Sequence, residues 1–249
     1  MKLRALIFDV DGTLAETEEL HRAAFNAAFE AAGLGWHWSQ ASYARLLTTT
    51  GGKERIRRYM DETGVSGIDV ASLHADKTRR YTALVDGGSL ALRPGIAALM
   101  AQARASGLRL AIATTTSRPN VEALARCCFG LPAGDVFDVL ACGDEVARKK
   151  PAPDVYCLAL DRLALDPAGA LAFEDTPLGI ASAQGAGLAV VASAGLYSHG
   201  ADLSAAERVV ADFSDLVPGG LTGLAAIQAR RRPVKGSSAP LSGKTTRSA

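Results

Sequence analysis

The sequence predicts an α/β protein: a parallel sheet with helices on both faces, and a helical module inserted after the first strand. From Pro94 onward, short apolar runs alternate with stretches that suit helices, and this alternation favours a parallel sheet covered on both faces. Residues 17–90, in contrast, are almost wholly helical in pattern. We therefore expect an α/β core over residues 1–16 and 92–229, a helical cap over 17–91 and a tail over 230–249.

The elements follow in order along the chain. The apolar run Ala5–Phe8 is typical of a buried strand, and Thr17 is expected to cap a helix that ends at Gly33. Further helices are predicted near residues 39–48, 53–63 and 69–86. Later strands are predicted at Leu108–Ala113, Asp138–Ala141, Ala170–Phe173, Leu188–Ala192 and Arg208–Val210. Because proline suits the first helical turn, the intervening helices should begin near Pro94, Pro119, Pro153 and Pro177.

Composition places the chain among ordinary globular proteins. Of its 249 residues, 48% are hydrophobic and 21% charged, which is enough apolar material for a sizeable core. No apolar run reaches the roughly 18 residues that span a bilayer, and Met1-Lys2 leads directly into the first strand, so we expect no signal peptide and a cytoplasmic location. Its four cysteines form no C-x-x-C pair and are expected to be reduced thiols.

The formal net charge of +1 hides a basic end. Residues 230–249 hold six basic residues and no acid, so the rest of the chain is acidic on balance. This segment is also rich in Ser, Thr, Gly and Pro, a composition that favours disorder. No pattern of interleaved aromatic and basic residues accompanies it, so a nucleic-acid partner is not expected.

Asp9-Val10-Asp11-Gly12-Thr13 follows the first strand directly. At the carboxyl end of a parallel strand, both carboxylates would face the crevice where α/β sheets bind ligands. Unpaired, they would repel each other and lose solvation. A divalent metal removes that problem, and Mg²⁺ suits hard carboxylate oxygens. The alternative is an acidic surface turn.

Three further polar stations follow later strands. Thr114-Thr115-Thr116-Ser117 offers hydroxyls that can bind a phosphate oxygen, or that merely fill a turn and cap a helix. Lys149-Lys150-Pro151 holds a lysine extended before proline, although a lone Lys-Pro pair is usually a solvated loop. Glu174-Asp175-Thr176 again ends a buried strand in paired acids, with a helix cap as its alternative role.

Together, in this order, the four stations resemble the haloacid dehalogenase superfamily of phosphotransferases, over about residues 1–215. The resemblance implies a Rossmann-like core and a four-helix cap. It further implies that Asp9 attacks phosphorus and that Asp11 serves as acid and base. Mg²⁺ would be held by Asp9, Glu174, Asp175 and the backbone carbonyl of Asp11. Thr114 and Lys150 would neutralise the phosphoryl oxygens, with Lys149 as the competing lysine.

The cap is expected to select the substrate. Glu18 and His21 lie three apart and share a helix face, where they can meet substrate hydroxyls or a second anion. Gly51-Gly52-Lys53-Glu54-Arg55 can form an anion nest through Gly52, Lys53 and Arg55, or a plain turn with solvated charges. Tyr43 either lines the pocket or packs. The remaining substrate-binding candidates are Lys77, Thr115, Arg118 and Asn120.

Residues 9–21, taken with Thr-Thr-Thr-Gly-Gly-Lys-Glu-Arg at 48–55, resemble the CbbY-type xylulose-1,5-bisphosphate phosphatases. These enzymes remove an inhibitor of rubisco, which implies a role beside the Calvin cycle. The resemblance implies a sugar bisphosphate with one phosphate at Asp9 and the other at the basic cap residues. Thr176-Pro177-Leu178 departs from the commoner pattern of Ser and small residues.

Three alternatives remain open from the sequence. β-Phosphoglucomutase shares the core residues and also binds a bisphosphate, whereas a phosphoglycolate phosphatase would need no second cationic site. A catalytically silent binding module on the same fold is the alternative of a different class. Neither a membrane partner nor an oligomer is expected, and the protein should act as a monomer.

Overall fold

The computed structural model describes residues 2–88 and 90–231. Six parallel strands form one sheet in the order β3-β2-β1-β4-β5-β6. The strands are β1 (Ala5–Phe8), β2 (Arg109–Ala113), β3 (Val139–Ala141), β4 (Ala170–Glu174), β5 (Ala189–Ala192) and β6 (Arg208–Val209). All six predicted strands are therefore confirmed, with ends that differ by one residue at most. The tail expected at 230–249 lies outside the described residues from position 232 onward.

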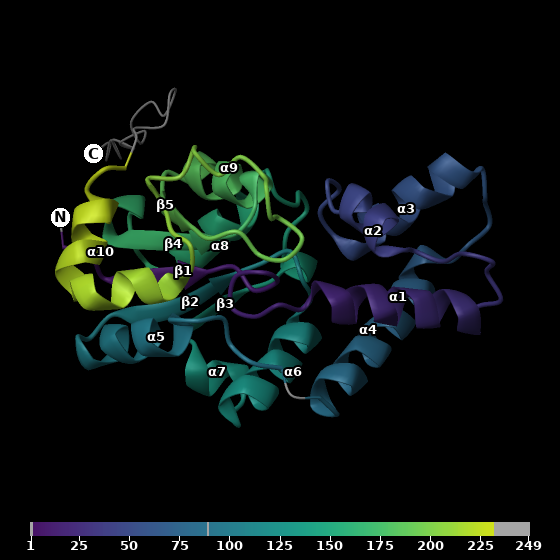
Figure 1. Ribbon diagram of the computed structural model, residues 1–249, viewed down its shortest axis with the longest axis horizontal. Helices are drawn as coiled ribbons and strands as arrows, with labels where there is room; N and C mark the ends of the chain where they lie inside the picture. Colours follow the sequence, from purple (N-terminus) through teal and green to yellow (C-terminus); the bar gives the residue numbers. More distant parts are fainter. Residues whose placement is uncertain (1, 89, 232–249) are drawn as a thin grey trace, which may run out of the picture.

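Alternation along β1 divides its side chains between two hydrophobic clusters. Leu6 and Phe8 face one side of the sheet, and Ala5 and Ile7 face the other. The first side is covered by α5 (Ile96–Ala105), α6 (Arg118–Phe129), α7 (Ala133–Val136) and α10 (Gly220–Gln228). The second is covered by α8 (Asp154–Leu163) and α9 (Pro177–Gly185). Figure 1 shows these two helical layers on either side of the sheet. The expected α/β fold is thus confirmed.

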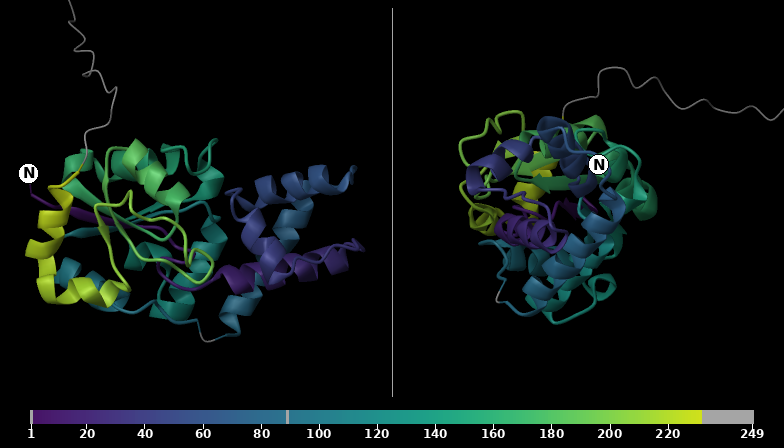
Figure 2. Two further views of the ribbon diagram at one scale, coloured as in Figure 1. Left: turned by 45° about the horizontal axis from the view of Figure 1, so that its top comes forward. Right: turned by 90° about the vertical axis from the view of Figure 1, so that its right-hand side faces the viewer.

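The cap contains the four expected helices: α1 (Glu18–Ala31), α2 (Gln40–Leu46), α3 (Gly52–Thr63) and α4 (Val70–Asp86). They pack around an aromatic cluster of their own that includes Phe25, Phe29, Trp38 and Tyr43. Figures 1 and 2 show them gathered beyond the carboxyl ends of the strands.

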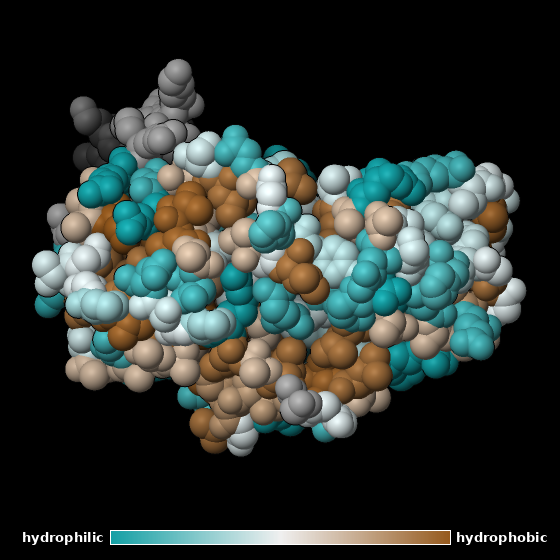
Figure 3. Space-filling view, in the orientation of Figure 1, coloured by the Kyte–Doolittle hydropathy of each residue, from teal (hydrophilic) through white to brown (hydrophobic). Residues whose placement is uncertain are grey.

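Two linkers connect the cap to the core, and they lie side by side. Ala15 and Leu92 form an antiparallel bridge, and the Arg93 amide donates to the Leu14 carbonyl at 2.8 Å. We propose residues 17–91 as the cap on this basis, since the chain leaves and re-enters the core at one place. On the face seen in Figure 3, hydrophobic residues gather where α4 meets α6, next to the second linker.

Some expectations about local structure were wrong or incomplete. Thr17 stands at the N-cap of α1 but makes no capping hydrogen bond, because its hydroxyl binds Asp11 instead. The helices α7 and α10 were not predicted from the sequence. The helix starts expected near Pro94, Pro119, Pro153 and Pro177 are confirmed, at Ile96, Arg118, Asp154 and Pro177. Within the described ranges, no helix has the length and apolar character that a membrane crossing requires.

Candidate active site

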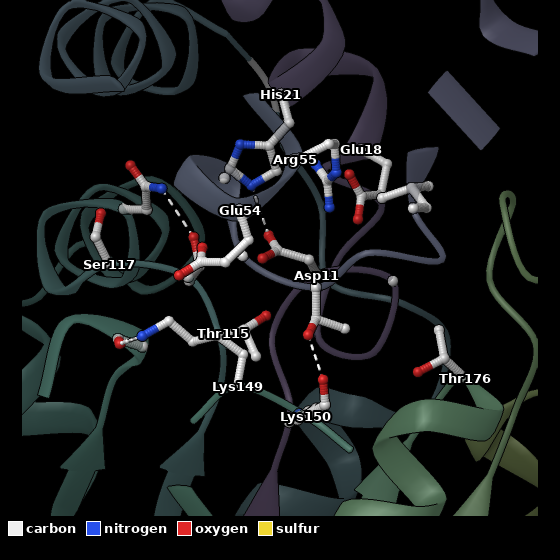
Figure 4. A pocket seen from close by; sticks show the side chains of 18 of the residues that line it. Asp11, Glu18, His21, Glu54, Arg55, Thr115, Ser117, Lys149, Lys150 and Thr176 are labelled. Carbon is white, nitrogen blue, oxygen red and sulfur yellow. Dashed lines mark hydrogen bonds and ion pairs between the residues drawn. The ribbon is translucent and has the colours of Figure 1, made fainter. Parts of the chain in front are cut away.

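A cavity of about 760 Å³ lies at the carboxyl ends of the central strands, beneath the cap. Core residues form its floor and cap residues its roof. Figure 4 shows Lys150, Thr115 and Thr176 on the core side, and Glu18 and Arg55 opposite them on the cap side. The cavity falls where open α/β sheets bind ligands, beyond the strands' carboxyl ends.

Asp9 extends the sheet by one residue, since its amide donates to the Phe173 carbonyl at 3.0 Å. Its buried carboxylate accepts a hydrogen bond of 2.6 Å from Lys150 Nζ, which also donates to Glu174 Oε1 at 2.6 Å. Lys149 turns elsewhere and donates to the backbone carbonyls of Gly143 and Val146. The geometry thus places Lys150, and not Lys149, beside the candidate nucleophile.

Burial dominates the electrostatics of this floor. It is the largest cause that raises the pKa of Asp9 to about 7, with repulsion from Glu174 and Asp11 adding to it and Lys150 opposing it. Burial also raises the pKa of Asp175 well above its usual value, with Asp9 and Glu174 contributing. Although burial opposes the charge of Lys150, attraction to Asp9 and Glu174 raises its pKa.

Asp9, Glu174 and Asp175 bring carboxylate oxygens within 4.8 Å of one another. Three buried acids face one lysine, so negative charge is left over, and a hard divalent cation fits this set of oxygen donors. The loop is shaped around the acids: Gly12 has φ +79°, and a Cβ there would lie 2.4 Å from Asp175 Oδ2. The geometry therefore fits the predicted cation site.

Asp11 is the end of a hydrogen-bonded chain from the cap. Its Oδ1 accepts from the Thr17 hydroxyl at 2.5 Å and lies 2.9 Å from His21 Nε2. Lys77 Nζ lies 2.6 Å from His21 Nδ1, and the His21 ring stacks on Tyr81. Both ring nitrogens of His21 are thus engaged by protein groups, unlike the substrate contact expected from the sequence.

The charges along this chain favour an ionised Asp11. Burial alone would raise the pKa of Asp11, but attraction to His21 and hydrogen bonds from His21 and Thr17 outweigh it and lower that pKa to about 2. Burial also lowers the pKa of Lys77 to about 7. Burial and the charge of Lys77 lower the pKa of His21. Lys77 and His21 thus disfavour each other's charged form, while Asp11 favours the charge of both.

The hydroxyl station after β2 differs from the expectation by one residue. Thr114 is fully enclosed, and its hydroxyl accepts a hydrogen bond from the Thr116 amide. Thr115, in the bend that follows β2, lines the cavity in its place. Thr114 therefore shapes the loop, and Thr115 is the hydroxyl placed to meet a ligand.

Residues after this station also line the cavity. Asn120 is buried and donates to Thr116 Oγ1 at 2.8 Å, which leaves its amide oxygen without a hydrogen-bond partner within the described ranges. Ser117, the last residue of the predicted hydroxyl station, lines the cavity too, and its Oγ is likewise without a hydrogen-bond partner there. Arg118, which was expected to bind substrate, lies outside the cavity lining and pairs at 3.4 Å with Glu145.

Arg55 is the most informative residue of the roof. Its guanidinium is buried, lies 5.1 Å from the centre of the Tyr43 ring, and makes no ion pair with any described carboxylate. Its Nε lacks a hydrogen-bond partner among the described residues, while one of its terminal nitrogens donates to the Tyr43 hydroxyl at 3.1 Å. Arginine is costly to bury unpaired, so this end of the cavity fits an anionic ligand.

The other cap candidates divide into two groups. Gly52, Lys53 and Glu18 line the cavity as expected, and so does Lys77, although its ammonium group is engaged with His21. Tyr43 does not line it: the ring is enclosed in the cap core, and its hydroxyl donates to Glu18 at 2.6 Å. Of the two roles left open for Tyr43, packing is the observed one.

Three contributors to the site were missed. His74 lies one helical turn before Lys77 and lines the cavity, so the helical spacing of α4 could have revealed it. Tyr156 donates to Glu174 at 2.7 Å from the first turn of α8. Ser198 donates to Asp175 at 3.0 Å from the loop after β5, and no sequence pattern marked it.

Comparison with known proteins agrees with this geometry. A family model for haloacid dehalogenase-like hydrolases matches residues 3–187. The chain is 56% identical to protein CbbY of Rhodobacter capsulatus, over 86% of this chain and 95% of that protein. It is 52% identical to protein CbbY of Cereibacter sphaeroides, over 89% of this chain and 96% of that protein.

Solved structures extend the comparison. The structure of CbbY from Rhodobacter sphaeroides in complex with phosphate superimposes with a TM-score of 0.86 at 52% identity, covering 89% of this chain and 99% of that one. A mutant of the same protein, in complex with xylulose-(1,5)bisphosphate, gives the same values. A β-phosphoglucomutase from Clostridium difficile shares the fold, with a TM-score of 0.73 at 19% identity over 86% of this chain and 93% of that one. The chain belongs to the haloacid dehalogenase-like hydrolases and, among them, to the CbbY proteins.

Proposed function

We propose that this protein is a Mg²⁺-dependent phosphatase of sugar bisphosphates, with xylulose-1,5-bisphosphate as its substrate. The observation that carries the proposal is the two-ended cavity. Asp9, Lys150 and a cluster of acids lie on the core side, and Arg55, which makes no ion pair with any described carboxylate, lies on the cap side. A substrate with one phosphate at each end satisfies both. The complex of the similar CbbY with xylulose-(1,5)bisphosphate supports this choice.

In the first step, an oxygen of Asp9 attacks the substrate phosphorus, and the bond from phosphorus to the sugar oxygen breaks. Asp11 gives the departing oxygen its proton. Because a bound phosphate repels a second negative charge, its arrival favours the protonated form of Asp11 that this step requires. Lys150 and Thr115 donate to the phosphoryl oxygens, and Lys150 screens Asp9 from them.

In the second step, water attacks the phosphorus of the phosphorylated Asp9, and Asp11 now accepts the proton of that water. Phosphate leaves and Asp9 is regenerated. Hydrogen bonds from Thr17 and His21 stabilise the carboxylate form of Asp11 that the water step uses. Mg²⁺, when held by Asp9, Glu174 and Asp175, would supply positive charge against the phosphoryl group.

The distal phosphate is assigned to Arg55, Lys53 and the Gly52 end of α3. Asn120 and Ser117 line the same cavity, each with an unpartnered polar atom among the described residues. Glu18, oriented by Tyr43, is the proposed partner for sugar hydroxyls. We also propose that the protein acts as a cytoplasmic monomer in support of the Calvin cycle, which size-exclusion chromatography and localisation of the tagged chain test.

The deciding experiment measures phosphate release from xylulose-1,5-bisphosphate and from p-nitrophenyl phosphate, with and without Mg²⁺. We expect the bisphosphate to give a kcat/KM at least about 100-fold higher, because a second ionic contact contributes about 3 kcal/mol. Arg55→Gln should remove most of that preference while sparing p-nitrophenyl phosphate. Faster conversion of β-glucose 1-phosphate to glucose 6-phosphate would instead identify a mutase, and no Mg²⁺-dependent release from any of the three would leave a binding module.

A further inference from the structure

Four consecutive residues after β5 lie between the core and the cap. Gly195–Ser198, here called the bridging segment, belongs to the loop between β5 and β6, which Figure 1 shows reaching from the core toward the cap. Its first and last residues contact the cation site, and its two middle residues contact the cap and the first linker. The bridging segment therefore contacts both the cation site and the cap within four residues.

Ser198 holds the candidate metal ligand Asp175. Its hydroxyl accepts from the Gly195 amide at 2.8 Å and donates to Asp175 Oδ2 at 3.0 Å. A serine hydroxyl has a single proton, so the amide contact leaves that proton for the carboxylate. Gly195 packs against the same group, since a Cβ there would lie 3.2 Å from Asp175 Oδ2 and 3.0 Å from the Gly12 carbonyl. The segment is therefore fitted to one position of Asp175.

Tyr197 makes the contact with the cap. Its hydroxyl donates a hydrogen bond to Glu19 of α1, and its ring meets Tyr43 edge-on, 5.5 Å between centres. Tyr43 is fully enclosed in the cap, so the tyrosine from the core docks on the cap's rigid interior. The neighbouring Leu196 amide donates to Glu16 of the first linker at 3.1 Å.

We propose that the bridging segment couples the position of the cap to the orientation of Asp175. Ser198 is then a positioning residue for the metal ligand Asp175, and the contacts of Tyr197 depend on the position of the cap. Neighbouring residues of one short segment share a backbone, so a cap that swings away from Tyr197 also loosens the Ser198 contact. This inference rests on the proposed function, in which Asp175 binds Mg²⁺.

The coupling is reciprocal by thermodynamic necessity. If the docked cap strengthens Mg²⁺ binding, then Mg²⁺ favours the docked cap to the same extent. The cavity would thus close most firmly over a loaded metal site, and water would be excluded when the phosphoryl group is ready to transfer.

A double-mutant cycle on Mg²⁺ affinity, measured by isothermal titration calorimetry with the full chain, tests the coupling. Ser198→Ala should raise the Kd for Mg²⁺ about 10-fold, as is typical when a group that orients a metal ligand is removed. Tyr197→Phe, which does not touch Asp175, should also raise that Kd, and its effect should vanish in the Ser198→Ala background. Glu19→Gln, which weakens the same bond from the cap side, should reproduce the shift.

Tyr59→Phe is the matched control. Its ring lies in the same aromatic cluster, 5.4 Å from Trp38, and its hydroxyl makes no hydrogen bond with any residue in the described ranges, so the Kd should stay unchanged. As a second measurement, Mg²⁺ should slow amide exchange in the linkers 14–17 and 90–93 of the wild type, and not in Ser198→Ala.

The outcomes separate the coupling from the function beneath it. The coupling is refuted if Tyr197→Phe leaves the Kd for Mg²⁺ unchanged. It is also refuted if the Kd changes of Tyr197→Phe and Ser198→Ala simply multiply in the double mutant. Neither result contradicts the proposed phosphatase function. If the wild type binds no Mg²⁺, the metal site fails and the coupling with it. Near-ultraviolet circular dichroism confirms that each variant is folded.

Discussion

Lys77 lies 2.6 Å from His21 Nδ1, although the two residues are 56 positions apart and belong to different cap helices. When the ammonium group donates, Nδ1 accepts, and the remaining ring proton must sit on Nε2, 2.9 Å from Asp11. Lys77 therefore acts on the acid/base group through an intermediary. We therefore expect Lys77 to have a different role from Lys53, Lys149 and Lys150, which also line the cavity.

Lys77→Met is expected to lower kcat about 10- to 100-fold with little change in KM, because Asp11 loses an oriented donor while the distal site remains intact. Lys53→Met should do the opposite and raise KM for the bisphosphate. Steady-state kinetics on both variants measure the split. Equal effects on kcat and KM in the two variants would refute the separate roles.

Lys77 should also make stability depend on pH. Its pKa is lowered from 10.5 to about 7, with burial as the largest cause. Between pH 7 and 10 the unfolded chain thus binds a proton there that the folded chain lacks, so this residue makes stability rise with pH. The expected slope is at most about 1.4 kcal/mol per pH unit. We expect urea unfolding across this pH range to show that the free energy of unfolding rises more steeply with pH in the wild type than in Lys77→Met.

The adjacent lysines 149 and 150 provide a matched pair. Lys150→Met leaves Asp9 and Glu174 buried without their cation, which should abolish turnover and cost about 3–5 kcal/mol of stability in the absence of metal. Lys149→Met removes only bonds to two backbone carbonyls, at about 1 kcal/mol each. Thermal unfolding and phosphate release measure both effects, and a larger loss of turnover in Lys149→Met would reverse the assignment.

Gly12→Ala should impair the cation site. An alanine at φ +79° is strained by about 1–2 kcal/mol, and its Cβ would also push against Asp175. Gly33→Ala, at φ +67° with nothing within 4 Å of a Cβ, carries the strain alone. Gly33→Ala should lose only the stability that corresponds to the backbone strain, Gly12→Ala should lose more because of the added clash, and only Gly12→Ala should bind Mg²⁺ more weakly by calorimetry. Weakening of similar size in Gly33→Ala would argue against a contact effect.

The sequence was informative where a chemically suitable side chain stands next to the end of a strand or the start of a helix. Asp9 and Asp175 follow a strand, Glu174 ends one and Lys150 precedes a helix, and parallel strands bring such positions to one edge. Thr114 and Thr115 could not be separated, because the bend that follows β2 decides which hydroxyl faces the cavity, and four hydroxyl residues in a row do not indicate where the chain bends. Arg118 was misplaced for a related reason, since its rotation about α6 is fixed by packing.

Residues far apart in the chain were the hardest to find. Nothing near Tyr197 or Ser198 marks them as neighbours of Glu19 and Asp175, which lie 178 and 23 positions away. Their contacts depend on where the loop after β5 ends up once the sheet and the cap are assembled. His74 is intermediate, because helical spacing links it to Lys77 but gives no sign that α4 faces the core.

The central strand of the sheet is the first to be synthesised, yet both of its neighbours come late. Phe8 pairs with Ile112 on one side and with Phe173 on the other. During translation, β1 must therefore wait, with its hydrogen-bonding edges open, while the entire cap is made and can already fold by local contacts. We expect the nucleophile loop to acquire its shape only when β4 arrives, so a ribosome-bound chain stopped before residue 170 would carry a folded cap and no catalytic floor.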